Sequence, residues 1–194
     1  PCQIQNLIVD VNEDVFAIAD VGGNTIMIFQ KSGLKGEIET TLPIEKISVS
    51  NQGIVSAILK NESTPQIISY DAVGNILVEH QVNLNSTVYP ISLDMSADGE
   101  NLMVSYLSTK NGTLKSMVAF YNFGKEGQEK TDNLIYTEDF DQTVVPDVFY
   151  MDASTSVAVG DKSFVIYEGT KSVKKKTEVK LNQEIRSEFH SDRY

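Results

Sequence analysis

A pattern of four short strands recurs four times along the chain. In each repeat, β-branched and aromatic residues alternate with polar residues over short stretches, and turns rich in Gly, Asn, Asp and Ser separate the stretches. Each third stretch ends near an aromatic residue, and these residues are 41, 51 and 46 positions apart: Phe29, Tyr70, Tyr121 and Tyr167. Units of about 40 to 50 residues with four strands each are typical of β-propeller blades. The sequence therefore predicts an all-β fold of the β-propeller type.

The repeats predict four blades of four antiparallel strands, at about residues 6–40, 44–82, 89–136 and 144–181. The tail EIRSEFHSDRY matches the opening of the fourth blade, VPDVFYMDAST, at a constant offset of 40 residues. We therefore expect residues 182–194 to start a further blade. On this interpretation, residues 1–194 are a single propeller region and part of a larger propeller of about seven or eight blades.

The charge balance argues against nucleic acid as a partner. The chain has 16 Lys and Arg against 27 Asp and Glu, which gives a net charge of −11. Such a surface repels a phosphate backbone and an anionic membrane alike. There is no apolar run of about 18 residues, so a membrane link is expected only through an anchor outside this sequence.

Few residues carry chemistry in a recognisable pattern. The two histidines, His80 and His190, are far apart in the sequence, and His80 is expected to be a solvated residue on an outermost strand. The segment TEDFDQT, with Glu138, Asp139 and Asp141, could offer oxygens to calcium but lacks the rest of a calcium-loop pattern, so it is predicted to be an acidic surface loop. We expect no metal, no cofactor and no catalytic residues.

The lysine run at 174–176 stands out in an acidic chain. It is predicted to be a solvated edge, because lysines on a strand edge discourage pairing with other chains.

Three residues are candidates for binding a ligand or partner: Tyr89, Asp141 and Asp161. They belong to loops that join second to third strands or one blade to the next, and in propellers these loops share one face. Each also has a structural interpretation. Asp161 could stabilise a turn, and Pro90 could simply hold Tyr89 at the start of a blade.

The stretches VFAIADVGGNTIMIFQKSG, ISVSNQGIVSAIL, LDMSADGENLMVSYLSTKNGTLKSMVAFYNF and VAVGDKSFVIYE resemble a family of β-propellers of unknown function from Gram-positive bacteria, with WD40-like and YVTN-like blades. Members of that family carry a membrane anchor and an extracytoplasmic propeller. The resemblance implies an extracytoplasmic location in an anchored full-length protein. It supplies no catalytic residues.

Two classes of function remain open. The first is a non-enzymatic binding or scaffolding propeller whose partner is a protein or a cell-envelope component, with self-association of this chain also expected. The alternative is an enzyme that acts on glycans through two carboxylates of the face loops. A quinoprotein-like oxidoreductase is disfavoured, because such blades commonly dock through tryptophan and this chain has none.

Overall fold

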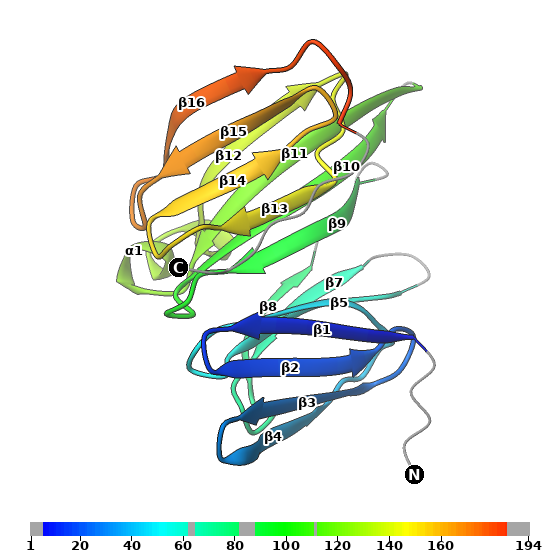
Figure 1. The fold of residues 1–194 in the computed structure, drawn as a ribbon, viewed down its shortest axis with the longest axis vertical. Helices are drawn as coiled ribbons and strands as arrows, with labels where there is room; N and C mark the ends of the chain where they lie inside the picture. Colours follow the sequence, from blue (N-terminus) through cyan, green and yellow to red (C-terminus); the bar gives the residue numbers. More distant parts are fainter. Residues whose placement is uncertain (1–5, 62–64, 82–87, 111, 186–194) are drawn as a thin grey trace. The chain divides into compact units, whose positions relative to one another are not determined.

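The computed structural model describes residues 6–61, 65–81, 88–110 and 112–185. It contains four antiparallel sheets of four strands each, and within each sheet neighbouring strands follow the order of the sequence (Figure 1). The alternating pattern of the sequence explains this local structure, because successive side chains of a strand point to opposite faces. The prediction of four blades of four antiparallel strands is confirmed.

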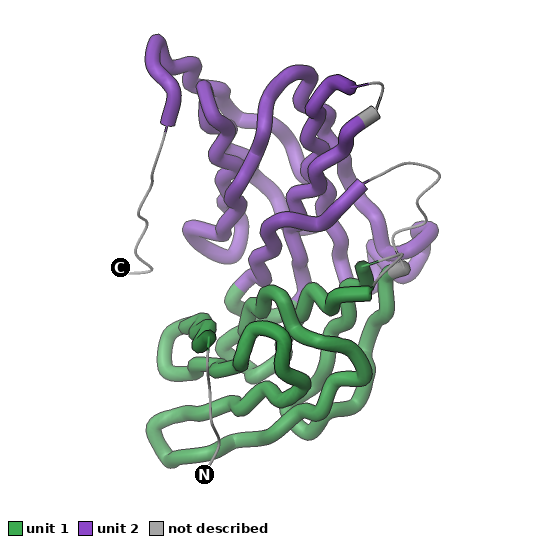
Figure 2. Tube along the Cα trace, turned by 90° about the vertical axis from the view of Figure 1, so that its right-hand side faces the viewer, with its two compact units in different colours: residues 1–83, 97–99 green, residues 84–96, 100–194 purple. Residues whose placement is uncertain are grey.

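The chain divides into two compact units (Figure 2). Unit 1 comprises residues 1–83 and 97–99 and holds the first two sheets. Blade 1 consists of β1 (Leu7–Asn12), β2 (Val15–Asp20), β3 (Thr25–Gln30) and β4 (Gly33–Glu39). Blade 2 consists of β5 (Ile44–Val49), β6 (Val55–Leu59), β7 (Gln66–Tyr70) and β8 (Ile76–Gln81).

Unit 2 comprises residues 84–96 and 100–194 and holds the other two sheets. Blade 3 consists of β9 (Val88–Met95), β10 (Asn101–Lys110), β11 (Thr113–Asn122) and β12 (Leu134–Asp141). Between β11 and β12 lie the short helix α1 (Lys125–Gln128) and the 3-10 turn η1 (Thr131–Asn133). Blade 4 consists of β13 (Asp147–Tyr150), β14 (Thr155–Val159), β15 (Ser163–Glu168) and β16 (Lys174–Lys180).

Within each unit, two sheets pack face to face around an apolar core. In unit 1 this core is built mainly from Ile, Val and Ala side chains of β2, β3, β5 and β6. In unit 2, side chains of β10 and β11 pack against those of β13, β14 and β15. Both faces of a blade interior are buried, as Leu102, Met103, Val104 and Tyr106 on β10 show with 1% exposure or less. The sequence pattern alone leaves open which face is buried, and the structure buries both.

The same hydrogen bond joins the first strands of the two blades in each unit. The backbone N–H of Val49 donates to Oδ2 of Asp10 at 2.6 Å, and the N–H of Tyr150 donates to Oδ2 of Asp94 at 2.6 Å. Each carboxylate satisfies a backbone donor that faces the neighbouring blade. These contacts set the spacing of the two first strands within a unit.

Several sequence predictions differ from the structure. The fourth strand of blade 3 ends at Asp141, beyond the predicted end near residue 136, because two ten-residue strands, β10 and β11, lengthen this blade. His80 is 6% exposed, so the prediction that it is solvated is wrong; its partner in the ladder is the buried Ile67 on β7. His190 and most of the predicted start of a further blade lie outside the described residues. Within the described residues, no helix is long and apolar enough to cross a bilayer.

Candidate functional site

A groove of about 460 Å³ lies in unit 2, where the outermost strands of blades 3 and 4 face each other. The end of β12, the β14–β15 turn and β16 line it. Its wall is mainly charged, and the charged residues that line it are Glu138, Asp139, Asp141, Lys162, Lys175, Glu178 and Lys180. The antiparallel register explains the placement: Lys175 lies opposite Tyr167, and Glu178 lies opposite Val165.

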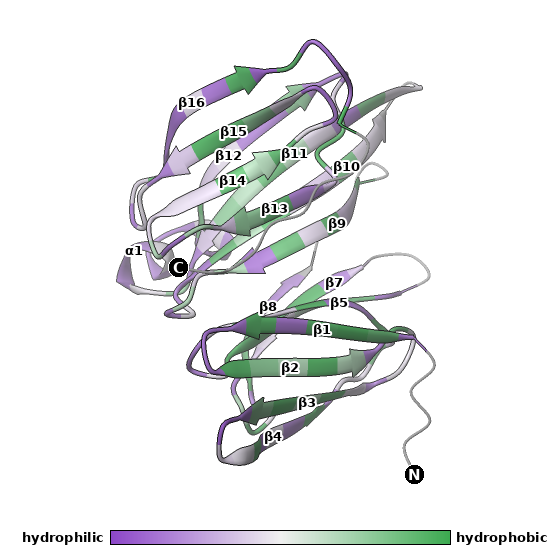
Figure 3. Cartoon of the chain, in the orientation of Figure 1, coloured by the Kyte–Doolittle hydropathy of each residue, from purple (hydrophilic) through white to green (hydrophobic). Residues whose placement is uncertain are grey.

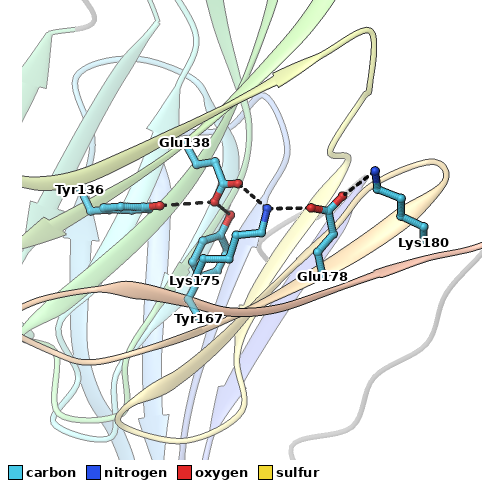
Figure 4. A network of polar contacts seen from close by, with 6 residues as sticks. All are labelled: Tyr136, Glu138, Tyr167, Lys175, Glu178 and Lys180. Carbon is cyan, nitrogen blue, oxygen red and sulfur yellow. Dashed lines mark hydrogen bonds and ion pairs between the residues drawn. The ribbon is translucent and has the colours of Figure 1, made fainter.

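Glu138, which lines this groove, joins two tyrosines and a lysine in a network of polar contacts (Figure 4). Its Oε2 accepts a 2.8 Å hydrogen bond from the hydroxyl of Tyr167 and a longer contact, 3.5 Å, from the hydroxyl of Tyr136. Its Oε1 accepts a 2.8 Å hydrogen bond from Nζ of Lys175. The Glu138 side chain is 18% exposed, so this carboxylate is largely enclosed. Hydrogen bonds from three protein groups replace those that water would otherwise donate to it.

Lys175 connects Glu138 to a second carboxylate. Its Nζ donates to Oε2 of Glu178 at 2.7 Å, and Oε1 of Glu178 lies 4.0 Å from Nζ of Lys180. The four charged groups thus form a chain of alternating sign along the groove (Figure 4). Each charge in this chain lies next to a charge of opposite sign, so the net charge of the four groups is zero. Lys180, at one end of the chain, has a side chain that is 83% exposed to solvent.

The pKa shifts of three groups in this network, Tyr167, Lys175 and Glu178, keep them in their ordinary charge states at neutral pH. Burial, followed by the hydrogen bond to Glu138, raises the pKa of the Tyr167 hydroxyl. The hydrogen bond to Glu138 raises the pKa of Lys175, and the hydrogen bond from Lys175 lowers the pKa of Glu178. A general acid needs a carboxyl with a raised pKa, which Glu178 does not have.

Three aromatic side chains pack against one another in the core of unit 2, behind Glu138, and do not line the groove. The ring centroids of Phe120 and Tyr167 are 5.0 Å apart, and those of Phe120 and Tyr136 are 5.8 Å apart, both in edge-to-face geometry. Tyr136 and Tyr167 also meet edge to face at 6.1 Å. These rings belong to blades 3 and 4, so their packing fixes the distance between β12 and β15 and holds the two hydroxyls beside Glu138.

The three residues predicted to bind a ligand lie at the same end of the blades of unit 2. Asp141 ends β12, Asp161 lies in the β14–β15 turn, and Tyr89 is the second residue of β9. Neighbouring strands of an antiparallel blade run in opposite directions. The first and third strands therefore start at the end of the blade where the second and fourth strands finish. Only Asp141 lines the groove. There it forms an ion pair with Lys115, its direct partner in the β11–β12 ladder.

Asp161 is held through its backbone, and Tyr89 lies at the start of blade 3. The N–H of Asp161 donates to the carbonyl of Val144 at 2.9 Å, and its own carbonyl accepts from the N–H of Ile185 at 2.7 Å. Its Oδ1 is buried and has no hydrogen-bond partner among the described residues. Tyr89 is 49% exposed, lies opposite Leu107 in the ladder and does not line the groove.

The structure corrects the prediction for the acidic segment and adds ion pairs to the prediction for the lysine run. Glu138 and Asp139 lie on the strand β12, not in a surface loop, and Glu138 is half-buried. The lysine run 174–176 is exposed on the outermost strand β16, as predicted, and in addition Lys175 pairs with Glu138 and Glu178 and Lys176 pairs with Glu168. The sequence does contain a signal for the pairing of Lys175 with Glu138. The fourth strand of the third repeat is acidic, and the fourth strand of the next repeat is basic.

The structure places no cluster of three or more His, Cys, Asp or Glu residues in a position to hold a metal ion, among the residues that it describes. In the acidic segment, Glu138 and Asp139 point to opposite faces of β12, and Glu138 and Asp141 are each bound to a lysine. The geometry of this segment therefore does not suit calcium, which takes about six to eight oxygen ligands.

Comparison with known proteins assigns the chain to a family. The family model described as a family of unknown function, DUF5711, matches residues 1–194. The chain belongs to the DUF5711 family. A search among curated proteins found no match.

Solved structures with a similar fold are β-propellers of low sequence identity. Hsv2 of Kluyveromyces lactis is 9% identical, with a TM-score of 0.60, over 89% of this chain and 62% of that protein. A protein from Lactobacillus plantarum is 13% identical, with a TM-score of 0.57, over 91% of this chain and 56% of that protein. The chain thus spans about three fifths of the length of these propellers, and the likeness shows the fold alone.

Proposed function

We propose that this DUF5711 chain is a non-enzymatic binding or scaffolding module that docks a protein partner in the groove between β12 and β16. The observation that carries the proposal is the network around Glu138, in which every charged group already has an opposite partner. Such groups offer a fixed pattern of charge to a partner, and they are not poised to transfer a proton.

The mouth of the groove supplies the groups for recognition. Lys162 and Lys180 have side chains that are 61% and 83% exposed, and Asp139 on the opposite wall is exposed too. A partner segment that carries both acidic and basic residues would match this rim. The packed rings of Phe120, Tyr136 and Tyr167 and the Glu138 network hold β12 and blade 4 in place without rearrangement, which lowers the entropic cost of binding.

The alternative, a glycan-acting enzyme, has one observation in its favour. Glu138 and Glu178 both bind the same ammonium nitrogen, so two carboxylates line one groove. However, Lys175 lies between them and lowers the pKa of Glu178. Glycoside hydrolysis needs one carboxyl that is protonated at the working pH. The binding proposal therefore fits the groove better.

We also propose, from the resemblance in sequence to anchored propellers, that the groove faces an extracytoplasmic partner such as a protein or a component of the cell envelope. Anchoring and a Gram-positive source stay predictions. Protease treatment of intact cells checks the location: a tagged full-length protein outside the cytoplasmic membrane is cleaved, and a cytoplasmic one is protected.

Site-specific photo-crosslinking tests the groove. A photo-reactive amino acid replaces Thr143, which lines the groove, or Lys130, which is exposed in the same unit outside it. We expect the full-length protein to crosslink one protein partner from position 143 and not from position 130. Adding the double substitution Lys162→Glu and Lys180→Glu should abolish that crosslink, whereas Lys130→Glu should preserve it.

Two results would contradict the proposal. Equal capture from both positions, or capture that survives both charge reversals, would place the partner elsewhere. If the purified protein hydrolyses cell-wall glycan fragments and the Glu138→Gln variant does not, the alternative function as a glycan-acting enzyme is established instead.

A further inference from the structure

The outer strand of blade 4 differs in charge from the outer strands of the other blades. β16 carries four lysines and one glutamate in its seven residues, whereas β12 carries three carboxylates and no lysine or arginine. β4 has one lysine and two glutamates, and β8 has one glutamate. Figure 3 shows β16 as mostly hydrophilic. β16 is therefore a basic strand in a chain whose net charge is −11.

The backbone edge of β16 that faces away from β15 is open in the described part of the chain. β16 is the last strand in the order β13-β14-β15-β16. β4, β8 and β12 hold the same position in their sheets, and their edges are equally open although the chain continues after each of them into a further blade. The open edge therefore belongs to the position of a fourth strand in its sheet. Such an edge presents a row of N–H and C=O groups that can pair with another strand.

The contacts of β16 within the chain show which group its lysines bind. Nζ of Lys175 lies 2.8 Å from the carboxylate of Glu138 and 2.7 Å from that of Glu178. Lys176 forms an ion pair with Glu168. A carboxylate is thus the ordinary partner of a lysine on this strand.

The lysines at the two ends of β16 are accessible from outside. Lys174, the first residue of the strand, is exposed. Lys180, the last residue, has a side chain that is 83% exposed, and its Nζ lies 4.0 Å from the carboxylate of Glu178. The two lysines are about 20 Å apart, because a strand rises by about 3.3 Å per residue. Each of them can bind a carboxylate at one end of an extended segment.

The lysines restrict the kind of strand that can pair with this edge. A second basic strand would place lysine opposite lysine, and like charges that lie directly opposite each other destabilise a strand pair. An acidic strand would turn the same positions into pairs of opposite charge. Edge lysines therefore exclude most strands and favour an acidic one.

We infer that the open edge of β16 binds an extended acidic segment of a partner protein, which adds to blade 4 as a fifth strand. Backbone hydrogen bonds join the segment to β16, and carboxylates at its two ends bind Lys174 and Lys180. The inference goes beyond the groove between β12 and β16, because Lys174 does not line that groove.

Fluorescence anisotropy of a labelled peptide tests the inference on the purified chain. The probe is the peptide EETVTEE, which has two glutamates at each end and residues with high β-propensity in the middle. We expect saturable binding with a dissociation constant below about 500 µM, and no binding of the charge-reversed peptide KKTVTKK. Lys174→Glu should raise the dissociation constant at least about fivefold. Lys130→Glu is the matched control, because Lys130 is exposed in unit 2 and lies outside β16. Circular dichroism verifies that both variants are folded.

Two N-methylated forms of the peptide separate strand addition from simple attraction between charges. One form carries methyl groups on the amide nitrogens of its second, fourth and sixth residues, and the other on those of its third and fifth residues. A strand turns only alternate N–H groups toward a given neighbour, so one form should lose binding and the other should keep it. Neither form changes the charge of the peptide.

Three results would overturn the inference. The first is an equal effect of the two methylated forms, and the second is equal binding of the peptide to the wild type and to Lys174→Glu. The third is self-association of the chain that Lys174→Glu abolishes, which would assign the edge to the acidic strand β12 of a second copy. The photo-crosslink from position 143 is a separate measurement, so failure of the groove proposal can be told apart from failure of this inference.

Discussion

The hydroxyl of Tyr167 on β15 donates a 2.8 Å hydrogen bond to Oε2 of Glu138 on β12, and so joins the third strand of blade 4 to the fourth strand of blade 3. The tyrosine ring is buried, with no exposed surface, and packs edge to face on Phe120. The hydrogen bond therefore fixes a carboxylate at the groove wall from within the core of unit 2.

Tyr167→Phe tests the contribution of this bond. The substitution keeps the ring packing and removes one donor from Glu138, so it should lower the free energy of unfolding by about 1.5–3 kcal/mol, the range for hydrogen bonds to charged groups. Urea denaturation measures the change. Tyr89→Phe is the matched control, because Tyr89 is 49% exposed and should change the stability little. Equal stability of the wild type and Tyr167→Phe would show that water replaces the hydroxyl at no cost.

Val104→Asp should destabilise blade 3 by about 3–5 kcal/mol, because Val104 is fully buried on β10 and the aspartate would have no partner for its charge. Val73→Asp makes the same change at an exposed position in the β7–β8 turn and should leave the melting temperature nearly unchanged. If both variants melt together with the wild type, β10 is not a central strand of its blade.

Gly36→Ala should destabilise unit 1 for a steric reason. A Cβ at position 36 of β4 would collide with the backbone carbonyl of Ala72 in blade 2, and a backbone group cannot rotate away as a side chain can. Overpacking of this kind costs about 1–3 kcal/mol or more. Leu34→Ala, at an exposed position on the same strand, is the comparison and should cost much less. A fully stable Gly36→Ala protein would show that the two blades separate easily at this point.

Asp94 should stabilise the fold mainly through the oxygen that accepts a hydrogen bond, and less through its negative charge. Asp94→Leu leaves the N–H of Tyr150 without its 2.6 Å acceptor and should lower the free energy of unfolding by about 1–3 kcal/mol. Asp94→Asn retains an oxygen at the same place and should lose clearly less. Chemical denaturation of both variants measures the difference. Equal losses would mean that the negative charge, rather than the hydrogen bond, stabilises the contact between β9 and β13.

Stability should fall in acid through carboxylates with lowered pKa values. Hydrogen bonds from Ser154 lower the pKa of Asp152 below 3.8, and the hydrogen bond from Lys175 lowers the pKa of Glu178 below 4.5. A folded-state pKa below the unfolded value gives stability that is complete above the unfolded pKa and is lost as the pH falls through the folded one. The melting temperature should therefore be flat near neutral pH with respect to these groups and fall below about pH 4.5. Asp152→Asn should reduce the steepness of that fall, and an unchanged acid profile would contradict the assignment.

The positions of the third strands could be predicted from the sequence, because the pattern that forms a strand is local. Phe29, Tyr70, Tyr121 and Tyr167 were predicted to mark third strands, and they lie on β3, β7, β11 and β15. A period of two in hydropathy and a turn every few residues suffice to locate such strands, since neighbouring side chains of the same stretch carry the signal.

The ion-pair partners of the charged side chains could not be predicted from such a local pattern. Glu138 was predicted to lie in an acidic surface loop and Lys175 on a solvated edge, yet they bind each other across 37 positions of sequence. Two residues meet at such a distance only when the packing of two blades and the register of two outer strands are both set. His80 is buried for the same reason, because the ladder and its neighbours, not its strand alone, decide its exposure.

The sequence by itself determined that this chain forms blades of four antiparallel strands, because alternation and turn chemistry are encoded within each stretch of about ten residues. Only the tertiary structure decided that β12 and β16 form a charged groove and that Glu138 and Lys175 meet there. Both features arise where separate sheets meet. The free energy of such contacts depends on shape and distance between segments far apart in the chain, which no local pattern specifies.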